Sequence, residues 1–298
     1  MTTLSRVGPT GPRYRGGMLR EWTRDDTIGY LRVPTAADDK YSRGVVALRT
    51  GSAAYPGAAV LGVEAAWRAG AGYVRYVGDA KDAVLARRPE TVATTDLGHT
   101  RVGAWVIGSG TDAAHRSDHE QLVLNRILSG TAPVVVDAGA LDLVVGASAP
   151  VLLTPHSGEL ARLREHLGLR TSDAADALDT PRKRMDAAAE TAERVGAPVL
   201  LKGARTMIAA PDADTITVDN APHWLSTAGT GDVLAGVLGA LIAANPDRPL
   251  AEVAAAGAWL HGHAAAMASG AVGEAVGHPI VALDVAEALP HAIADLLS

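Results

Sequence analysis

Cysteine and phenylalanine are absent from this 298-residue chain, and aromatic residues make up only 4% of it. The lack of cysteine excludes disulfide bonds, thiolate metal sites and a cysteine nucleophile. With so few aromatic side chains, alanine, valine and leucine have to fill the core. Lysine is scarce as well, because only 4 of the 27 basic residues are lysines: Lys40, Lys81, Lys183 and Lys202. Each of them is therefore of interest as a candidate site residue.

Long apolar runs and a strong net charge are also missing. The longest clean apolar stretch, residues 233–244, has 12 residues, whereas a membrane span needs about 20. The formal charge is −6 and no Lys/Arg-rich block occurs, which argues against nucleic acid or an anionic membrane as a partner. The N-terminus is polar and lacks the apolar segment of a secretory signal. We therefore expect a cytoplasmic protein with neither nucleic-acid nor membrane partners.

The distribution of glycine, proline and apolar residues predicts one α/β domain over residues 38–298, preceded by an irregular N-terminal arm over residues 1–37. In the domain, short β-branched runs alternate with alanine-rich helical stretches, as in βαβ units on a parallel sheet. The expected strands are Val45–Leu48, Tyr73–Val77, Trp105–Ile107, Val134–Val136, Val151–Leu153 and Val199–Leu201, followed by an antiparallel piece formed by Thr206–Ala209 and Ile216–Val218. The expected helices are Gly57–Ala69, His119–Leu128, Gly158–His166, Pro181–Val195, Gly231–Ala244, Ala251–Ala268 and Ala282–Leu297.

Small and polar residues follow five of these strands. They include Gly51, Gly108–Gly110, Asp137, the segment 154–159 and Lys202. In a parallel sheet these strand ends share one edge, where open α/β folds bind ligands. Connections after strands favour glycine, aspartate and serine in any case, but this preference does not explain His156, Glu159 and Lys202 together. The pattern predicts a ligand site at this edge.

The segment Ala228–Gly236 contains the most distinctive motif, Gly-Thr-Gly-Asp. At Gly229, Thr230 and Gly231, backbone N–H groups can turn toward one point at the start of a helix, which makes an anion hole for a phosphoryl group. An ionised Asp232 could accept a proton from an attacking hydroxyl there, or it could simply cap the helix. There is no P-loop, and no dinucleotide-binding fingerprint, because Ala113 stands where the third glycine would be needed.

Five segments together resemble the ADP-dependent NAD(P)H-hydrate dehydratases of the ribokinase-like superfamily. They are GSAAYPGAA (51–59), VDAGAL (136–141), LTPHSGE (153–159), LKGART (201–206) and AGTGDVL (228–234). The last motif is common to the superfamily, whereas its combination with the first and third is much more specific. The resemblance covers about residues 40–262, so we expect no room within these 298 residues for the epimerase domain fused to some members. It implies a three-layer α/β/α fold with a mostly parallel central sheet.

The resemblance also implies a reaction, the repair of NADH and NADPH whose nicotinamide ring has taken up water (NADHX and NADPHX). The terminal phosphoryl group of ADP passes to the ring hydroxyl, and the phosphate ester then eliminates, which restores NAD(P)H and releases AMP and phosphate. Phosphorylation is useful because hydroxide is a poor leaving group. Mg²⁺ suits phosphate oxygens, carboxylates and water. Members form tetramers, so we expect a homo-oligomer.

Residue roles follow from the same resemblance. Asp232 is implied to be the base and to contact the substrate, together with Ala58, Gly110 and His156. Glu159 is implied to organise Mg²⁺ through water. The implied nucleotide-binding residues are Lys202, Gly203, Ala204, Arg205, Thr206 and Gly231.

Simpler roles remain open for three of these residues. His156 could bond the backbone of its own helix start, Glu159 could complement the same helix start, and Lys202 could be a solvated strand end.

Two departures from the family pattern affect details. Ser109 replaces the proline of a frequent Gly-Pro-Gly, which is expected to loosen that turn. Trp224 precedes the Gly-Thr-Gly-Asp motif, and we expect it to fill the core rather than to stack on a ligand ring. His261 and His263 are two residues apart on a predicted helix, so they make a poor metal pair.

Two other functions stay open at this stage. A kinase of the same superfamily would phosphorylate a vitamin-type alcohol and release a stable ester. A nucleotide-binding module without catalysis would not need a base such as Asp232.

Overall fold

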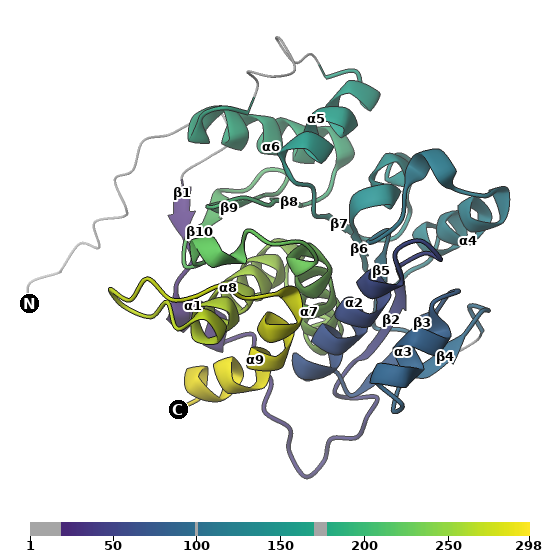
Figure 1. Cartoon of the computed structure of the whole chain (residues 1–298). Helices are drawn as coiled ribbons and strands as arrows, with labels where there is room; N and C mark the ends of the chain where they lie inside the picture. Colours follow the sequence, from purple (N-terminus) through teal and green to yellow (C-terminus); the bar gives the residue numbers. More distant parts are fainter. Residues whose placement is uncertain (1–18, 99–100, 170–177) are drawn as a thin grey trace, which may run out of the picture.

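A computed structural model describes residues 19–98, 101–169 and 178–298 of the chain. Within these ranges, ten strands form one sheet in the order β1-β10-β9-β8-β7-β6-β5-β2-β3-β4 (Figure 1). All neighbouring strands are parallel, except that β9 is antiparallel to both β8 and β10. The strands are β1 (Leu19–Glu21), β2 (Val45–Arg49), β3 (Tyr73–Val77), β4 (Val92–Thr94), β5 (Ala104–Ile107), β6 (Val134–Val136), β7 (Val151–Leu153), β8 (Val199–Leu201), β9 (Thr206–Ala209) and β10 (Thr215–Val218).

Helices cover both faces of the sheet, which gives the predicted three layers. One layer contains α1 (Arg24–Ile28), α2 (Pro56–Arg68), α3 (Lys81–Arg87), α7 (Thr230–Ala244), α8 (Leu250–Ser269) and α9 (Ala282–Leu296). The other contains α4 (Asp118–Leu128), α5 (Ser157–His166), α6 (Pro181–Val195) and the 3₁₀ turn η2 (Ala138–Leu143). Two further 3₁₀ turns are η1 (Ala113–His115) and η3 (His223–Leu225). No helix within the described ranges has the length and apolar character that a bilayer crossing requires.

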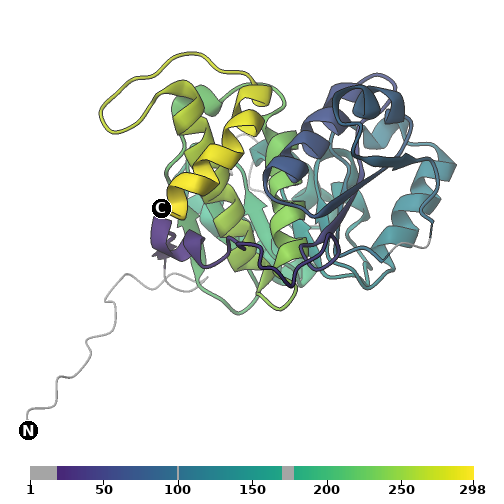
Figure 2. The same cartoon turned by 90° about the horizontal axis from the view of Figure 1, so that it is seen from below.

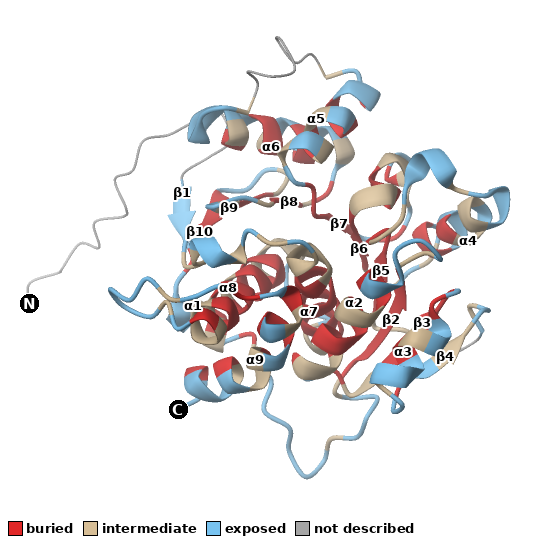
Figure 3. Cartoon of the chain, viewed as in Figure 1, coloured by how far each residue is buried: buried red, intermediate tan, exposed pale blue. Residues whose placement is uncertain are grey.

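The central strands are buried on both faces, as Figure 3 shows for β2, β5 and β6. Successive side chains of a strand point to opposite faces, so Val135 of β6 belongs to one core cluster whereas Val134 and Val136 belong to the other. This arrangement explains why these strands appear in the sequence as continuous apolar runs rather than as alternating ones.

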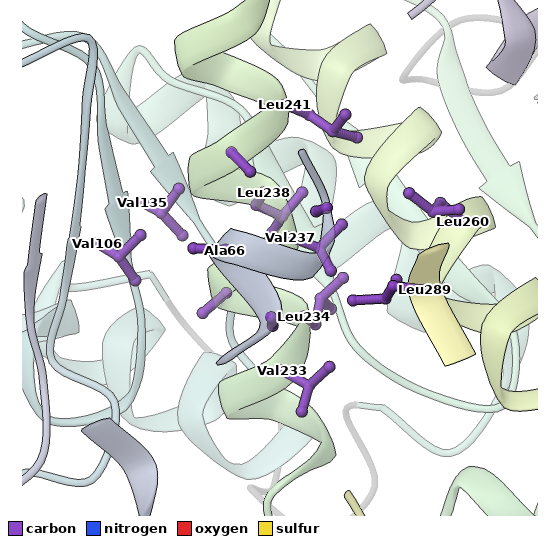
Figure 4. Packing of buried hydrophobic residues seen from close by; sticks show 14 of the residues in the cluster. Ala66, Val106, Val135, Val233, Leu234, Val237, Leu238, Leu241, Leu260 and Leu289 are labelled. Atoms are coloured by element: carbon purple, nitrogen blue, oxygen red, sulfur yellow. The ribbon is translucent and has the colours of Figure 1, made fainter. Parts of the chain in front are cut away.

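Helix α7 lies at the centre of the larger core and is buried on all sides. Val233, Leu234, Val237, Leu238 and Leu241 project from it toward the sheet and the surrounding helices (Figure 4). Alanine, valine and leucine dominate both clusters, which confirms the expectation from the lack of phenylalanine. Small residues let α7 approach its neighbours closely, as at Gly236, where an added Cβ would lie 2.2 Å from the carbonyl oxygen of Gly62 on α2.

The expected helices and strands of residues 45–296 are present with bounds shifted by one residue or less, and the antiparallel piece is confirmed. Four short helices and strands of the described residues were not predicted, namely β1, α1, α3 and β4, and neither were the three 3₁₀ turns. The expectation of an irregular arm is wrong from Leu19 to Ile28, and residues 1–18 lie outside the described ranges. Where the chain divides into domains stays a prediction.

Trp22 explains how this N-terminal stretch is held. Its side chain is only 3% exposed, and its backbone N–H donates to the carbonyl of Thr217 at 2.9 Å. A reciprocal capping box between Thr23 and Asp26 starts α1, a signal that the sequence does contain. At the C-terminus, α9 ends beside α1 (Figure 2), where Arg24 and Asp295 form an ion pair of 2.8 Å.

Replacing Gly236 tests the close packing of α2 and α7. We expect Gly236→Ala to lower the free energy of unfolding by about 1–3 kcal/mol, because the new methyl group would overlap the backbone of α2. Urea denaturation measures the difference. Gly57→Ala is the matched control, since a Cβ at Gly57 on α2 meets nothing within 4 Å. A Gly236→Ala protein as stable as the wild type would contradict this packing.

Candidate active site

The carboxyl ends of β6, β7 and β8 bring charged residues together beside the N-terminus of α7. Asp137 directly follows β6, Glu159 lies in the first turn of the helix after β7, and Lys202 directly follows β8. The fourth residue, Asp232, lies in the first turn of α7. The predicted ligand edge therefore does gather His156, Glu159 and Lys202, and α7 adds Asp232 to them.

Lys202 lies at the centre of this group, with its side chain only 19% exposed. Its Nζ donates to Asp137 Oδ1 at 2.7 Å and lies 3.6 Å from Glu159 Oε2. Burial by itself would lower the pKa of Lys202, but the carboxylates of Asp137 and Glu159 outweigh burial, so the pKa is raised. Lys202 is therefore a charged ammonium held at the site, and its description as a solvated strand end is wrong.

Asp137 was expected at the ligand edge but had no role assigned to it from the sequence. It is 3% exposed and accepts hydrogen bonds from the hydroxyls of Ser109 and Thr154, each at 2.9 Å, in addition to the bond from Lys202. The carboxylate at the end of β6 therefore connects to the segments that follow β5, β7 and β8. Its place directly after an apolar strand was visible in the sequence, but its partners come from distant segments.

Asp232 has an altered proton affinity. Burial raises the pKa of Asp232 to about 6, the negative charge of Asp137 adds to this effect, and Lys202 opposes it. No hydrogen bond to its carboxylate is found within the described residues. The group is therefore mostly ionised at neutral pH and is still basic enough to accept a proton.

The start of α7 has the geometry of an anion site. Gly229 precedes the helix with φ +88°, a conformation that glycine adopts readily, and no side chain caps the helix. The first N–H groups of a helix have no partner within it, so those of Thr230 and Gly231 are available to an anion. Lys202 adds positive charge, since its Nζ would be 3.6 Å from a Cβ built on Gly231.

His156 and Glu159 cap α5. The Nδ1 atom of His156 accepts from the N–H groups of Gly158 and Glu159 at 3.0 and 3.3 Å, and Glu159 Oε2 accepts from the His156 N–H at 2.7 Å. The simpler roles considered for both residues are therefore present. Both residues can have a second role at the site, because His156 borders a cavity and Glu159 lies beside Lys202.

The segment after β5 contacts the start of α2. A Cβ on Gly110 would lie 2.3 Å from the Cβ of Ala58, so the two predicted substrate residues are in direct contact. The Gly51 N–H donates to the Ser109 carbonyl at 2.7 Å. The Ser109 hydroxyl provides a bond to Asp137 that proline cannot make. Whether this turn is looser than one with proline stays a prediction.

The nucleotide loop predicted over residues 202–206 is held from behind by Arg184 of α6. Its guanidinium donates to the Lys202 carbonyl at 3.0 Å and to the Ser157 hydroxyl, and a Cβ on Gly203 would lie 2.4 Å from it. Burial lowers the pKa of Arg184. The sequence analysis did not single out this residue. Arg205, by contrast, pairs with Asp219 at the surface.

Two cavities open at the carboxyl edge. The α7 cavity, of about 370 Å³, is lined by His156, Lys202, Gly203, Ala204, Thr206, Ala221, Pro222, His223, Leu225, Ser226, Thr230, Gly231, Leu234 and His261. The β2 cavity, of about 510 Å³, is lined by residues 49–55, Gly78, Asp79, Thr111, Asp112, residues 115–117 and Glu120. Ala58 lies in the first turn of α2, three residues after Tyr55, and Gly110 directly precedes Thr111, and both Tyr55 and Thr111 line the β2 cavity.

Trp224 does not lie where it was expected. Trp224 is 36% exposed and its Nε1 donates to the Val276 carbonyl at 2.7 Å, so the expectation that it fills the core is wrong. The 3₁₀ turn η3 places it at the surface.

The two histidines of α8 have different surroundings. His263 pairs with Asp295 at 2.9 Å, whereas the His261 ring is buried beside the α7 cavity.

The titration of Asp232 tests the charge arrangement. Because Lys202 lowers the pKa of Asp232, we expect Lys202→Met to move its midpoint upward from about 6. Carboxyl ¹³C NMR measures the shift, with Asp232→Asn identifying the resonance. Lys183→Met is the control, since Lys183 is an exposed residue of α6 that pairs with Asp179 just before the helix. An unchanged midpoint in a folded Lys202→Met protein would show that the two groups do not interact.

The comparisons with known proteins agree with this geometry. A family model described as NAD(P)H-hydrate dehydratase matches residues 46–281. A bifunctional NAD(P)H-hydrate repair enzyme of Mycobacterium leprae is 41% identical over 82% of this chain and 50% of its own length. An ADP-dependent (S)-NAD(P)H-hydrate dehydratase of Neisseria meningitidis is 35% identical over 78% of this chain and 80% of its own. The chain thus spans about half the length of the bifunctional relative.

The fold comparison points the same way. The crystal structure of the ADP/ATP-dependent NAD(P)H-hydrate dehydratase from Bacillus subtilis, co-crystallised with ATP/Mg²⁺, superimposes with a TM-score of 0.79 at 27% identity, over 93% of this chain and 98% of that one. The family model covers well over half of the chain, and the fold is that of ribokinase-like proteins. The chain belongs to the NAD(P)H-hydrate dehydratase family.

Proposed function

We propose that the protein uses ADP to dehydrate NADHX and NADPHX. The observation that carries the proposal is the meeting of Lys202, the N-terminus of α7 and Asp232 at one edge of the sheet. A phosphoryl group in transfer needs the positive charge and the N–H groups, and the hydroxyl that receives it needs a base. The names of the relatives support the same reaction.

In the proposed complex, ADP lies in the α7 cavity with its terminal phosphate at the N–H groups of Thr230 and Gly231. The loop 202–206 contacts the nucleotide, mainly through Lys202 and backbone groups, since Arg205 pairs with Asp219. The hydrated dinucleotide lies toward Ala58 and Gly110, with His156 contacting it from the other side. This placement brings the ring hydroxyl to Asp232, between the two ligands.

The proposed chemistry has two steps. Asp232 accepts the proton of the ring hydroxyl while the hydroxyl oxygen attacks the terminal phosphorus of ADP, and the bond from that phosphorus to AMP breaks. The lone pair of the ring nitrogen then expels phosphate, and loss of a ring proton restores the double bond of NAD(P)H. Positioning and charge stabilisation do most of the work, because phosphate is a good leaving group.

Mg²⁺ is part of the proposal, since it screens phosphate charge during transfer. The described residues contain no group of three or more histidine, aspartate or glutamate side chains suited to hold a metal. Both Glu159 oxygens already have neighbours, Oε2 the His156 N–H and Oε1 the His156 ring at 3.5 Å. Phosphate oxygens and water would supply most ligands of the ion, and Glu159 would hold it through water. On the family resemblance we further propose a cytoplasmic homotetramer.

A coupled assay tests the function directly. We expect incubation with NADHX and ADP to restore the reduced-nicotinamide absorbance, with one AMP and one phosphate released for each NADH formed. Replacing ADP by AMP is the control, because AMP has no phosphoryl group to transfer at that position. A vitamin-type alcohol that is phosphorylated while NADHX stays unchanged with both ADP and ATP would favour the alternative, a small-molecule kinase.

Replacing the proposed base gives a second prediction. We expect Asp232→Asn to lower kcat by about 10²–10⁴-fold and to leave ADP binding nearly unchanged. In the wild type, kcat/KM falls as the pH drops below about 6, because the protonated carboxyl group cannot accept the substrate proton. Calorimetric ADP binding confirms that the variant folds. Full turnover in Asp232→Asn would rule out Asp232 as the base, and a flat wild-type profile through pH 6 would count against it.

A further inference from the structure

The imidazole of His261 has no role in the site described so far. It lies on α8, is only 5% exposed, and borders the α7 cavity. Its Nε2 atom has no hydrogen-bond partner within the described residues. A buried polar atom left unpaired is costly, so Nε2 calls for a partner that these residues do not supply.

The orientation of the ring decides what kind of partner Nε2 can take. Burial lowers the pKa of His261 to about 4, although a hydrogen bond to the backbone of Thr230 opposes the shift. The ring is therefore neutral at physiological pH. Because Nε2 has no partner within the described ranges, the nitrogen that bonds Thr230 is Nδ1, and a bond that favours the charged ring is one in which the ring donates its proton to the carbonyl. Nε2 then carries a lone pair and can only accept.

The rest of the cavity fits a nucleoside. Its wall includes the charged Lys202 and the backbone of Gly231 at the start of α7. It also includes four apolar side chains: Ala221, Pro222, Leu225 and Leu234. Flat, apolar faces such as those of a purine base suit these side chains, and a hydrogen-bond acceptor on the wall can read the edge of the base.

We propose that His261 selects adenine in the α7 cavity, with Nε2 accepting a hydrogen bond from the exocyclic amine. Hypoxanthine and guanine carry a carbonyl oxygen at that position, so two acceptors would face each other without a proton between them. His261 is thus a specificity residue and takes no part in the proton transfer at Asp232. The inference rests on the proposed use of ADP.

Equilibrium binding tests it without turnover. Calorimetry with the full chain compares ADP, inosine diphosphate and 2′-deoxy-ADP. We expect the wild type to bind ADP about tenfold more tightly than inosine diphosphate, and 2′-deoxy-ADP to bind as ADP does. In His261→Ala, ADP affinity should fall to that of inosine diphosphate. His263→Ala is the matched control, because His263 lies on the same helix and pairs with Asp295, and it should keep the full discrimination.

Several results would overturn the assignment. They are equal wild-type affinity for ADP and inosine diphosphate, unchanged discrimination in His261→Ala, and a loss with 2′-deoxy-ADP as large as that with inosine diphosphate. The last result would place the ribose hydroxyl at Nε2.

Imidazole ¹⁵N NMR of the wild type keeps the test independent of how the variant folds. The Nε2 signal should move with ADP and not with inosine diphosphate, and an unmoved signal would refute the contact. Selective ADP binding without recovery of NADH would refute the proposed reaction while leaving the role of His261 intact.

Discussion

The balance of charge around Lys202 is the interaction on which the site depends. Its ammonium group lies among three carboxylates, bonded to Asp137 at 2.7 Å, 3.6 Å from Glu159, and close enough to Asp232 to affect its pKa. Without the ammonium, repulsion among these carboxylates would favour protonation of Asp232. Without Asp137, nothing on the β6 side would hold the ammonium in place. The same cation can thus attract a phosphoryl group and keep the neighbouring base ionised.

The fold makes this balance rigid. Parallel strands end at one edge, so Asp137 and Lys202 come from two strands separated only by β7. Helix α7 is buried on all sides, and its glycines let it lie close to α2 and to the sheet. The N-terminus that would receive the phosphoryl group is therefore the end of the most deeply buried helix. A site built on such elements keeps its geometry better than one built on loops.

Several residues combine a structural and a functional role. His156 and Glu159 cap α5 and also face the site. Ser109 stands where relatives often have proline, and its hydroxyl fixes Asp137. For such residues a structural role and a functional role do not exclude each other, because Glu159 Oε2 both accepts from the His156 N–H and lies 3.6 Å from Lys202 Nζ.

Local patterns in the sequence determined much of this protein: the alternation of strands and helices from residue 45 onward, the sheet edge at which the charged side chains meet, and the motif that starts α7. These features depend on apolar periodicity, on glycine and on short segments. The short elements β1, α1, α3 and β4 were missed, because they depend on pairing and packing rather than on a long periodic run.

Only the tertiary structure decided the electrostatics. Asp137 became a site residue because Ser109, Thr154 and Lys202 reach it from three other segments. The pKa of Asp232 depends on burial and on charges that lie 30 and more positions away in the chain. His261 looked like an ordinary helix residue until the packing of α8 against α7 left its Nε2 without a partner. Burial and distance between remote segments are properties of the folded chain, so no local pattern could reveal them.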